Sequence, residues 1–314
     1  MSERDGHVWA VMKFGGTSVS SANCWLTICD QARQKLAEGK RVLIVVSALS
    51  GVTNLLTRVA RGVGETERKE ILAEVKAKHE ALLRSLEMEP PKEYLDRWRS
   101  LLDLTSSCGS AYQDEERALL LAHGELLSSS IGREVLVAAH LEAVWQDARK
   151  LLSVSADAEL DVLSARCDDD IDSELEQGLA DEGVLHITQG FIASGPGGET
   201  CLLGRGGSDT SAAYLAARLK AESLEIWTDV PGIFSADPRV VPESRLLNRL
   251  SYSEAQELAS MGAKVLHPPS IQPARRHQIP VFIKDTNRPS EPGTRIGART
   301  VSEEAQVKGV VSRN

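Results

Sequence analysis

Three segments of the chain combine small residues with charge in a pattern that suits the binding of an anion. They are Lys13–Ser18 (KFGGTS), Ser47–Asn54 (SALSGVTN) and Gly204–Asp209 (GRGGSD), and each follows a strand candidate. Glycines allow the backbone to approach a ligand closely, and a helix that begins just after such a turn offers free N–H groups. The three segments together predict a ligand site at the carboxyl ends of neighbouring strands.

The charged residues in these segments indicate which chemistry the site could perform. Lys13 supplies a mobile positive charge, and Arg205 offers a two-pronged donor for a carboxylate. Asp209 could cap a helix or could hold a lysine charged and oriented. Taken alone, the Gly-Gly turn after Lys13 and the Ser47–Asn54 segment are more typical of ordinary turns and caps. The combination in Gly204–Asp209 favours a functional site.

The elements that must position these residues follow a strand–helix–strand order. His7–Lys13 predicts a strand, and Ser20 or Ser21 can cap a helix that runs to Glu38. Arg41–Val46 (RVLIVV) is apolar throughout, which is typical of a parallel strand covered by helices on both faces. This order predicts a βαβ unit and an α/β fold.

Further elements are expected along the rest of the chain. Helices are predicted between Val52 and Gly132, with the last one ending near Gly132. The remaining candidates are strands at Glu134–Ala139, Leu185–Ile192, Leu224–Thr228, Pro280–Lys284 and Val307–Val311, and helices from Gly204–Asp209 to about Lys220, at Ser253–Met261 and at Pro269–His277.

Composition excludes several classes of protein. The chain has 314 residues and a net charge of −9, which argues against nucleic acid or an anionic membrane surface as a partner. No run approaches the roughly 20 apolar residues of a membrane span, and the polar N-terminus lacks a signal-peptide pattern. Five cysteines without a CxxC pair predict a reduced, cytoplasmic location.

Several well-known motifs are absent from the sequence. There is no G-x-x-x-x-G-K-[ST] loop, no complete G-x-G-x-x-G fingerprint and no H-E-x-x-H. His123, His186 and His267 lack metal-ligand spacing, so no metal site built by protein side chains is expected. A Rossmann oxidoreductase is the least favoured hypothesis, because its glycine fingerprint is missing.

Eight ordered segments resemble the catalytic region of the aspartate kinase family. They are KFGGTSV at Lys13–Val19, SALSGVTNL at Ser47–Leu55, HGELL at His123–Leu127, TQGF at Thr188–Phe191, GRGGSD at Gly204–Asp209, WTDVPGIF at Trp227–Phe234, DPR at Asp237–Arg239 and GAKVLHP at Gly262–Pro268. The resemblance implies the amino acid kinase fold, a three-layer αβα sandwich with a mostly parallel central sheet. It also implies transfer of the ATP γ-phosphoryl group to the side-chain carboxylate of L-aspartate, giving 4-phospho-L-aspartate.

The resemblance implies roles for individual residues on the substrate side. Lys13 would contact the transferring phosphoryl group with the amides of Gly15 and Gly16, and Asp209 would orient Lys13. Glu125 would pair with the substrate ammonium and Arg205 with its α-carboxylate. The residues lining the aspartate pocket would be Ser47, Thr53 and Ser208.

On the nucleotide side, the resemblance implies ATP and Mg²⁺ as cofactors. ATP would be bound by Lys13, Gly15, Gly16, Thr228, Asp229, Phe234, Arg239 and Lys264. Phe234 stands where the family often has tyrosine, so a hydrogen bond would be lost there while the ring is kept. A carboxylate acceptor is already ionised at neutral pH and needs no general base, which agrees with the lack of a histidine constellation.

The resemblance also implies a domain organisation. Residues 1–300 would form the kinase domain, with an aspartate-binding lobe to about residue 200 and an ATP-binding lobe over 201–300. Residues 301–314 would begin a regulatory, ACT-like region, so the chain could be cut from a longer regulatory or fused polypeptide. A homodimer is a further expectation.

Two alternatives to an aspartate kinase remain open from the sequence. One is a related carboxylate kinase that acts on glutamate or N-acetylglutamate. Glu125 discriminates against the acylated substrate, because a free ammonium group calls for a carboxylate and an N-acetyl group does not. The other is a non-catalytic amino-acid-binding subunit, which the presence of Lys13, Arg205 and Asp209 disfavours.

Overall fold

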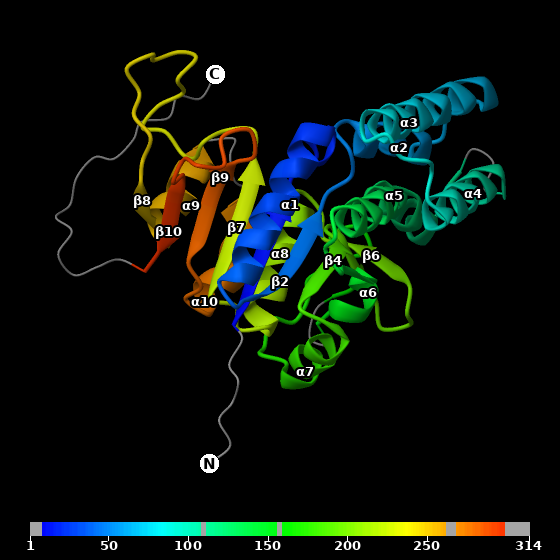
Figure 1. Ribbon diagram of the computed structural model, residues 1–314. Helices are drawn as coiled ribbons and strands as arrows, with labels where there is room; N and C mark the ends of the chain where they lie inside the picture. Colours follow the sequence, from blue (N-terminus) through cyan, green and yellow to red (C-terminus); the bar gives the residue numbers. More distant parts are fainter. Residues whose placement is uncertain (1–7, 108–110, 156–158, 262–267, 299–314) are drawn as a thin grey trace.

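A central sheet of eight strands organises the computed structural model, which describes residues 8–107, 111–155, 159–261 and 268–298. The strand order is β3-β4-β2-β1-β7-β9-β10-β8 (Figure 1). The strands are β1 (Trp9–Phe14), β2 (Arg41–Val46), β3 (Val144–Gln146), β4 (Leu185–Gln189), β7 (Ser223–Thr228), β8 (Arg249–Ser251), β9 (Val281–Asp285) and β10 (Thr294–Gly297). Neighbouring strands are parallel except at β9 and β10, so the sheet is mostly parallel, as predicted.

Helices cover both faces of this sheet and produce the predicted three-layer αβα sandwich. Figure 1 shows α1 in front of the central strands and α8 behind them. One face carries α1 (Ala22–Ala37), α2 (Val52–Ala60), α3 (Glu65–Ser85), α4 (Lys92–Ser107) and α5 (Asp114–Ala138). The other carries α6 (Ala148–Leu151), α7 (Ser173–Glu182), α8 (Gly207–Arg218), α9 (Tyr252–Met261) and α10 (Gln272–Arg276). Shorter elements are the β5–β6 hairpin (Ile192–Ser194 and Thr200–Leu202) and two 3₁₀ turns, Thr17–Val19 and Pro268–Ile271.

The apolar runs of β1 and β2 are buried because each contributes side chains to both layers. Met12 and Phe14 of β1 belong to the core on the α1 side, whereas Trp9 and Val11 belong to the core on the α8 side. Alternation along the strand therefore turns Lys13 toward α8. This direction decides which helix can supply its partner.

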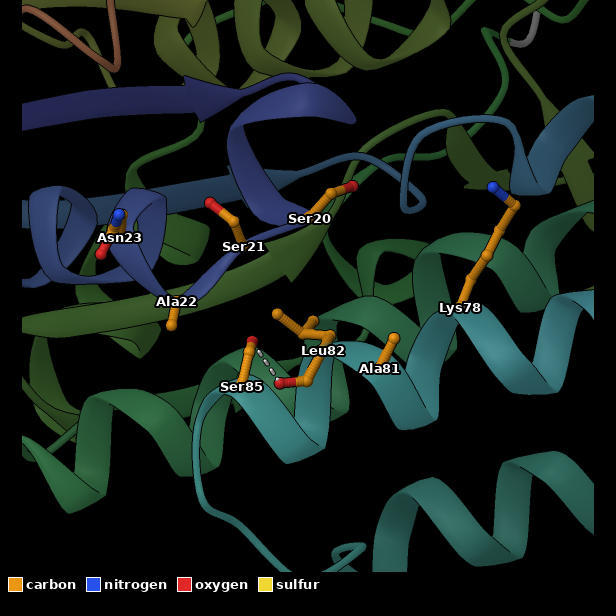
Figure 2. A pocket seen from close by; sticks show the side chains of 8 residues that line it. All are labelled: Ser20, Ser21, Ala22, Asn23, Lys78, Ala81, Leu82 and Ser85. Carbon is orange, nitrogen blue, oxygen red and sulfur yellow. Dashed lines mark hydrogen bonds between the residues drawn. The ribbon is translucent and has the colours of Figure 1, made fainter.

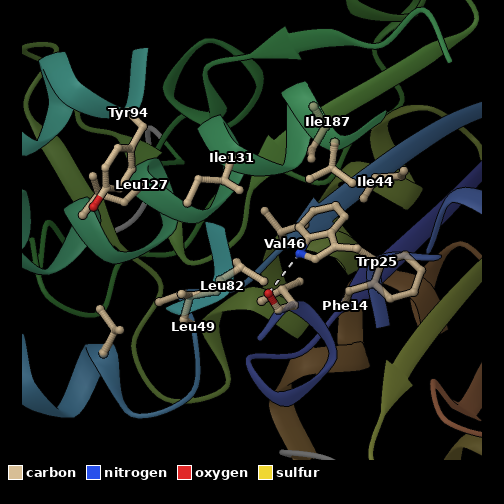
Figure 3. Close-up of a cluster of buried hydrophobic side chains, with 14 of the residues drawn as sticks. Phe14, Trp25, Ile44, Val46, Leu49, Leu82, Tyr94, Leu127, Ile131 and Ile187 are labelled. Carbon is tan, nitrogen blue, oxygen red and sulfur yellow. Dashed lines mark hydrogen bonds between the residues drawn. The ribbon is translucent and has the colours of Figure 1, made fainter. Parts of the chain in front are cut away.

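The core beneath α1 fixes the position of the β1 strand end (Figure 3). The Trp25 side chain is fully buried, and its indole N–H donates to the Val19 carbonyl at 3.0 Å. The Phe14 ring stacks on Trp227 of β7 with ring centroids 5.7 Å apart. Buried aromatic side chains therefore hold the turn that follows β1 in position.

The predicted strand at Glu134–Ala139 is wrong, because residues 134–138 are the last turn and a half of α5 and Ala139 is its C-cap. The helix was predicted to end near Gly132, but it continues past this residue to Ala138. A Cβ at Gly132 would lie only 2.2 Å from Cη2 of Trp25, so the glycine allows α5 to cross α1 closely. Val135 and Leu136 are buried on this helix against the same core.

Most other predicted elements agree with the structure to within a few residues. Ser21 caps α1, with its Oγ accepting from the Cys24 amide, and Gly39 follows the helix with φ +75°. The predicted strand Leu185–Ile192 is divided into β4 and β5 at Gly190. The candidate strand Val307–Val311 lies outside the described residues.

Candidate active site

Lys13 and Asp209 form an ion pair at the carboxyl end of the central strands. The Lys13 Nζ lies 2.6 Å from the Asp209 Oδ1, and both side chains are largely buried. Asp209 lies in the first turn of α8, which begins after Gly206 with φ +72°. The structure therefore brings together the lysine of one glycine-rich segment and the aspartate of another.

The Gly15-Gly16 turn lies directly beside the loop that follows β2. The Gly15 amide donates to the Trp227 carbonyl at 3.0 Å, which joins the turn to the end of β7. A Cβ at Gly16 would lie 2.8 Å from the Ala48 carbonyl oxygen. Only glycine permits this approach, so the small residues of both loops are needed for their contact.

Glu125 projects from α5 toward the same loop and is almost completely buried. Its Oε2 has no hydrogen-bond partner among the described residues. Burial raises the pKa of the carboxyl group to about 8, and the Ala48 amide and the charge of Lys13 lower it only in part. A buried acid that is not fully paired is costly to ionise, so a cationic ligand would stabilise its charged form.

Gly124 explains why α5 can place Glu125 there. A Cβ at Gly124 would lie 2.8 Å from the Ala48 Cβ, so a larger residue would push the helix away from the loop. One turn later, the Ser128 hydroxyl donates to the Ser47 carbonyl at 2.7 Å. The helix thus holds both Ser47 and Ala48 in place.

The remaining residues predicted to bind aspartate lie around this region. Ser47 follows β2, and its amide donates to the Phe14 carbonyl at 3.1 Å. Thr53 is half-buried in the first turn of α2. Ser208 packs against the chain where β4 ends, since a Cβ at Gly190 would lie 2.5 Å from the Ser208 Cβ.

Arg205 is exposed between two glycines in the left-handed region, Gly204 at φ +66° and Gly206 at φ +72°. Among the described residues, no carboxylate forms an ion pair with its guanidinium. These glycines fix the direction of the turn, because other residues rarely adopt such angles. Arg205 is therefore available to an anionic ligand.

The residues predicted to bind the nucleotide follow β7. Thr228 is half-buried at the strand end, next to the Trp227 carbonyl that holds Gly15, and its hydroxyl donates to exposed Asp229 at 3.2 Å. Phe234 is half-buried, and its backbone forms an isolated antiparallel β-bridge with Leu246.

Arg239 and Lys264 are not brought to the Lys13–Asp209 pair by any described contact. Arg239 is exposed and donates to both carboxylate oxygens of Asp237, at 3.0 and 2.7 Å. This hydrogen bonding raises the pKa of the guanidinium above its ordinary value. Lys264, like most of the GAKVLHP segment, lies outside the described residues.

Two of the three histidines considered in the sequence are buried. The Nδ1 of His123 lies 2.8 Å from the Leu119 carbonyl, and burial lowers the pKa of His123 and of His186. Both rings are therefore neutral at physiological pH. The third, His267, is outside the described residues.

Sequence reasoning missed the residues that join the loops to one another. Ala48, Gly124, Ser128 and Gly190 make the closest contacts, yet each is an ordinary small residue within or beside a motif. The available signal was the abundance of small residues in three segments that must meet at one edge of the sheet. Over residues 8–107, 111–155, 159–261 and 268–298, no group of three or more His, Cys, Asp or Glu residues could hold a metal ion, and no helix is long and apolar enough to cross a membrane.

Known proteins resemble this chain over most of its length. Lysine-sensitive aspartokinase 3 of Escherichia coli (strain K12) is 36% identical over 300 residues, which are 92% of this chain and 64% of that protein. The aspartokinase of Chlamydia pneumoniae is 36% identical over 307 residues, 96% of this chain and 66% of that protein. The chain thus spans just under two thirds of the length of these relatives.

A solved structure gives the same result. The crystal structure of E. coli aspartokinase III in complex with aspartate and ADP matches with a TM-score of 0.83 at 36% identity, over 93% of this chain and 65% of that one. A model of the amino acid kinase family matches residues 9–285, which include β1, α8 and β9. Together with the three-layer fold and the loops that meet at its strand ends, these matches show that the chain belongs to the amino acid kinase family.

Proposed function

We propose that this chain is an aspartate kinase, which transfers the γ-phosphoryl group of ATP to the side-chain carboxylate of L-aspartate. The products are 4-phospho-L-aspartate and ADP. The observation that carries the proposal is the buried, incompletely paired carboxylate of Glu125 beside the Lys13–Asp209 pair. The similarity to an aspartokinase crystallised with aspartate and ADP supports it.

The amino acid would be held by opposite charges at its two α-substituents. Its ammonium group would pair with the ionised form of Glu125, and its α-carboxylate with Arg205, which is exposed and available. Ser47, Thr53 and Ser208 would line the space between these charges. An N-acetylated amino acid would leave Glu125 without a cation, so the site favours a free amino acid.

Phosphoryl transfer would rely on positioning and on neutralisation of charge. The acceptor carboxylate is ionised at neutral pH, so its attack on phosphorus needs no general base. Lys13 would neutralise charge on the transferring group, with amides of Gly15 and Gly16 as further donors. Asp209 would hold the Lys13 ammonium group in position through their 2.6 Å ion pair.

ATP would enter along the end of β7, where Thr228, Asp229 and Phe234 lie, with Arg239 and Lys264 as further proposed contacts. Mg²⁺ would accompany ATP and offset the charge of its phosphates. Mg²⁺ usually takes one or two carboxylates together with substrate phosphates, so phosphate oxygens would supply many of its ligands here. No residue is assigned as its ligand.

The two halves of the chain would divide the work, with aspartate bound by residues to about 200 and ATP bound over 201–300. Residues 301–314 would begin an ACT-like regulatory region. We also propose a homodimer and a cytoplasmic location. Sedimentation of the purified chain tests the first, and fractionation of cells tests the second.

Parallel measurement of ADP release with aspartate, glutamate and N-acetylglutamate tests the proposed activity. We expect turnover with aspartate and a much smaller kcat/KM with the other two. Faster turnover with either of them would assign the chain to another carboxylate kinase of the family. Binding of aspartate without ADP release from a folded sample would favour the non-catalytic subunit.

A further inference from the structure

One hydroxyl group connects the two loops that would hold the two reactants. The Ser20 Oγ donates to the Gly16 carbonyl at 2.6 Å and accepts from the Ser50 amide at 2.9 Å. Gly16 belongs to the turn after β1, and Ser50 belongs to the loop after β2. No other described side chain hydrogen-bonds to both of these loops.

The two loops lie so close together that a small shift of either loop would change their contact. A Cβ at Gly16 would lie 2.8 Å from the Ala48 carbonyl oxygen and 3.4 Å from Ser50 Cα. The turn after β1 carries the amides proposed for the phosphoryl group. The loop after β2 carries Ser47, and its Ala48 amide hydrogen-bonds to Glu125. Their separation therefore sets the distance between donor and acceptor.

We propose that Ser20 is a positioning residue, whose hydroxyl fixes the loop that holds the phosphoryl donor against the loop that holds the amino acid. This inference rests on the proposed function, because it assigns the donor and the acceptor to these loops. Ser20 does not touch a reacting atom and acts through Gly16 and Ser50. Loss of its two hydrogen bonds would leave the reactants bound but poorly aligned.

The neighbouring serine provides a matched control. Ser21 is the N-cap of α1, and its Oγ accepts from the Cys24 amide at 3.3 Å. Ser20 and Ser21 both line a cavity of about 440 Å³ between the start of α1 and α3 (Figure 2). A substitution at either position therefore changes the same surface, but only Ser20 joins the loops.

The cavity also permits a conservative variant. Ser20 lines the cavity, so we expect the added methyl group of Ser20→Thr to be accommodated there while the hydroxyl keeps its place. Three variants distinguish the loss of the Ser20 hydroxyl from the effect of any substitution at this surface: Ser20→Ala, Ser20→Thr and Ser21→Ala. Each would be assayed for kcat and KM with aspartate and ATP, for melting temperature, and for hydrogen exchange of the Ser50 amide.

We expect Ser20→Ala to lower kcat by about 10- to 100-fold with little change in either KM, since misalignment by about 1 Å has effects of this size. The Ser50 amide should exchange about fivefold faster, as expected for the loss of one hydrogen bond. Ser20→Thr should restore both values. Ser21→Ala should melt at a lower temperature and keep kcat.

Three results would overturn the proposal: an unchanged kcat in Ser20→Ala, an equal loss of kcat in Ser21→Ala, or no faster exchange at Ser50 in Ser20→Ala. Failure of the proposed function has a different signature, because the unmodified chain would then release no ADP with aspartate. The exchange measurement reports on the loop contact independently of any substrate.

Discussion

Glu125 should make aspartate binding depend on pH near neutrality. Its carboxyl group has a pKa of about 8 because it is buried, whereas the ordinary pKa of a glutamate is 4.5. Only the ionised form can pair with the substrate ammonium. In the proposed role of Glu125, aspartate would therefore select the minor, ionised form of the site at pH 7, and its binding would release a proton.

The size of the effect follows from the fraction of Glu125 that is ionised. With a pKa of about 8, roughly a tenth of the sites are ionised at pH 7 and half at pH 8. The apparent dissociation constant varies inversely with this fraction, so KM for aspartate should fall about fivefold from pH 7 to pH 8 and about ninefold from pH 6 to pH 7. Aspartate binding at pH 7 should release about 0.9 proton.

Stability should change with pH in the opposite direction. The pKa of Glu125 is higher in the folded than in the unfolded chain, so the folded state binds more protons between about pH 4.5 and 8. The free energy of unfolding attributable to Glu125 therefore falls as pH rises through this window, by up to about 1.4 kcal/mol per pH unit. Below about pH 4.5, Glu125 is protonated in both states and this loss of stability is absent.

The variant Glu125→Gln separates these effects from those of other groups. It keeps the shape of the side chain and cannot ionise. We expect a higher KM for aspartate that no longer falls between pH 6 and 8, while KM for ATP is unchanged. Its melting temperature relative to the unmodified chain should rise with pH over the same window.

Steady-state kinetics from pH 6 to 8.5 and calorimetry in buffers of different ionisation enthalpy provide these measurements. A pH-independent KM for aspartate in the unmodified chain would contradict the reasoning. Equal increases of KM for aspartate and ATP in the variant would place Glu125 outside the aspartate pocket.

Three further substitutions test other parts of the site and the core. Lys13→Ala should lower kcat by about 10²- to 10³-fold and affect aspartate binding far less, and a near-normal kcat would show that the assigned role is wrong. Arg205→Ala should raise KM for aspartate by about 10- to 100-fold, as expected for lost hydrogen bonds to a charged group, and kinetics with ATP saturating would detect it. Gly132→Ala should destabilise the fold by about 1–3 kcal/mol because its Cβ would meet the Trp25 ring at 2.2 Å. Denaturant unfolding measures this loss, and kcat per folded molecule should stay the same.

Local signals were sufficient to predict the first βαβ unit. The apolar, β-branched run of β2 has the length of one strand, and Ser21 and Gly39 mark the two ends of α1 by their preferred backbone and capping geometry. None of these features depends on residues far away in the sequence. Their positions in the structure therefore match the prediction.

The end of α5 could not be predicted because it depends on a distant side chain. Gly132 resembles a helix terminator in isolation, and the residues after it include two valines that favour strands. In the fold, however, the glycine faces Trp25 of α1, and burial of Val135 and Leu136 continues the helix. Tertiary packing here outweighs local preference.

In the site, too, some features were predictable from the sequence and others depended on tertiary packing. The resemblance to the aspartate kinase family implied the pair of Lys13 and Asp209, whereas the residues alone left Asp209 open as a helix cap. The contacts of Ala48 with Gly16 and with Gly124 were not predictable, since they depend on how closely two loops and a helix approach in space.

The position of Glu125 connects the stability of the fold with the choice of substrate. The close contacts at Gly16 and Gly124 bring α5 and the two loops together and thereby bury a carboxylate whose Oε2 has no hydrogen-bond partner among the described residues. Ionisation of this group costs folding free energy, and a bound ammonium group recovers it. An acylated amino acid has no positive charge to offer, so it would leave that cost uncompensated. In the proposed function, the discrimination would therefore arise from the positive charge of the ammonium group, which only the free amino acid carries.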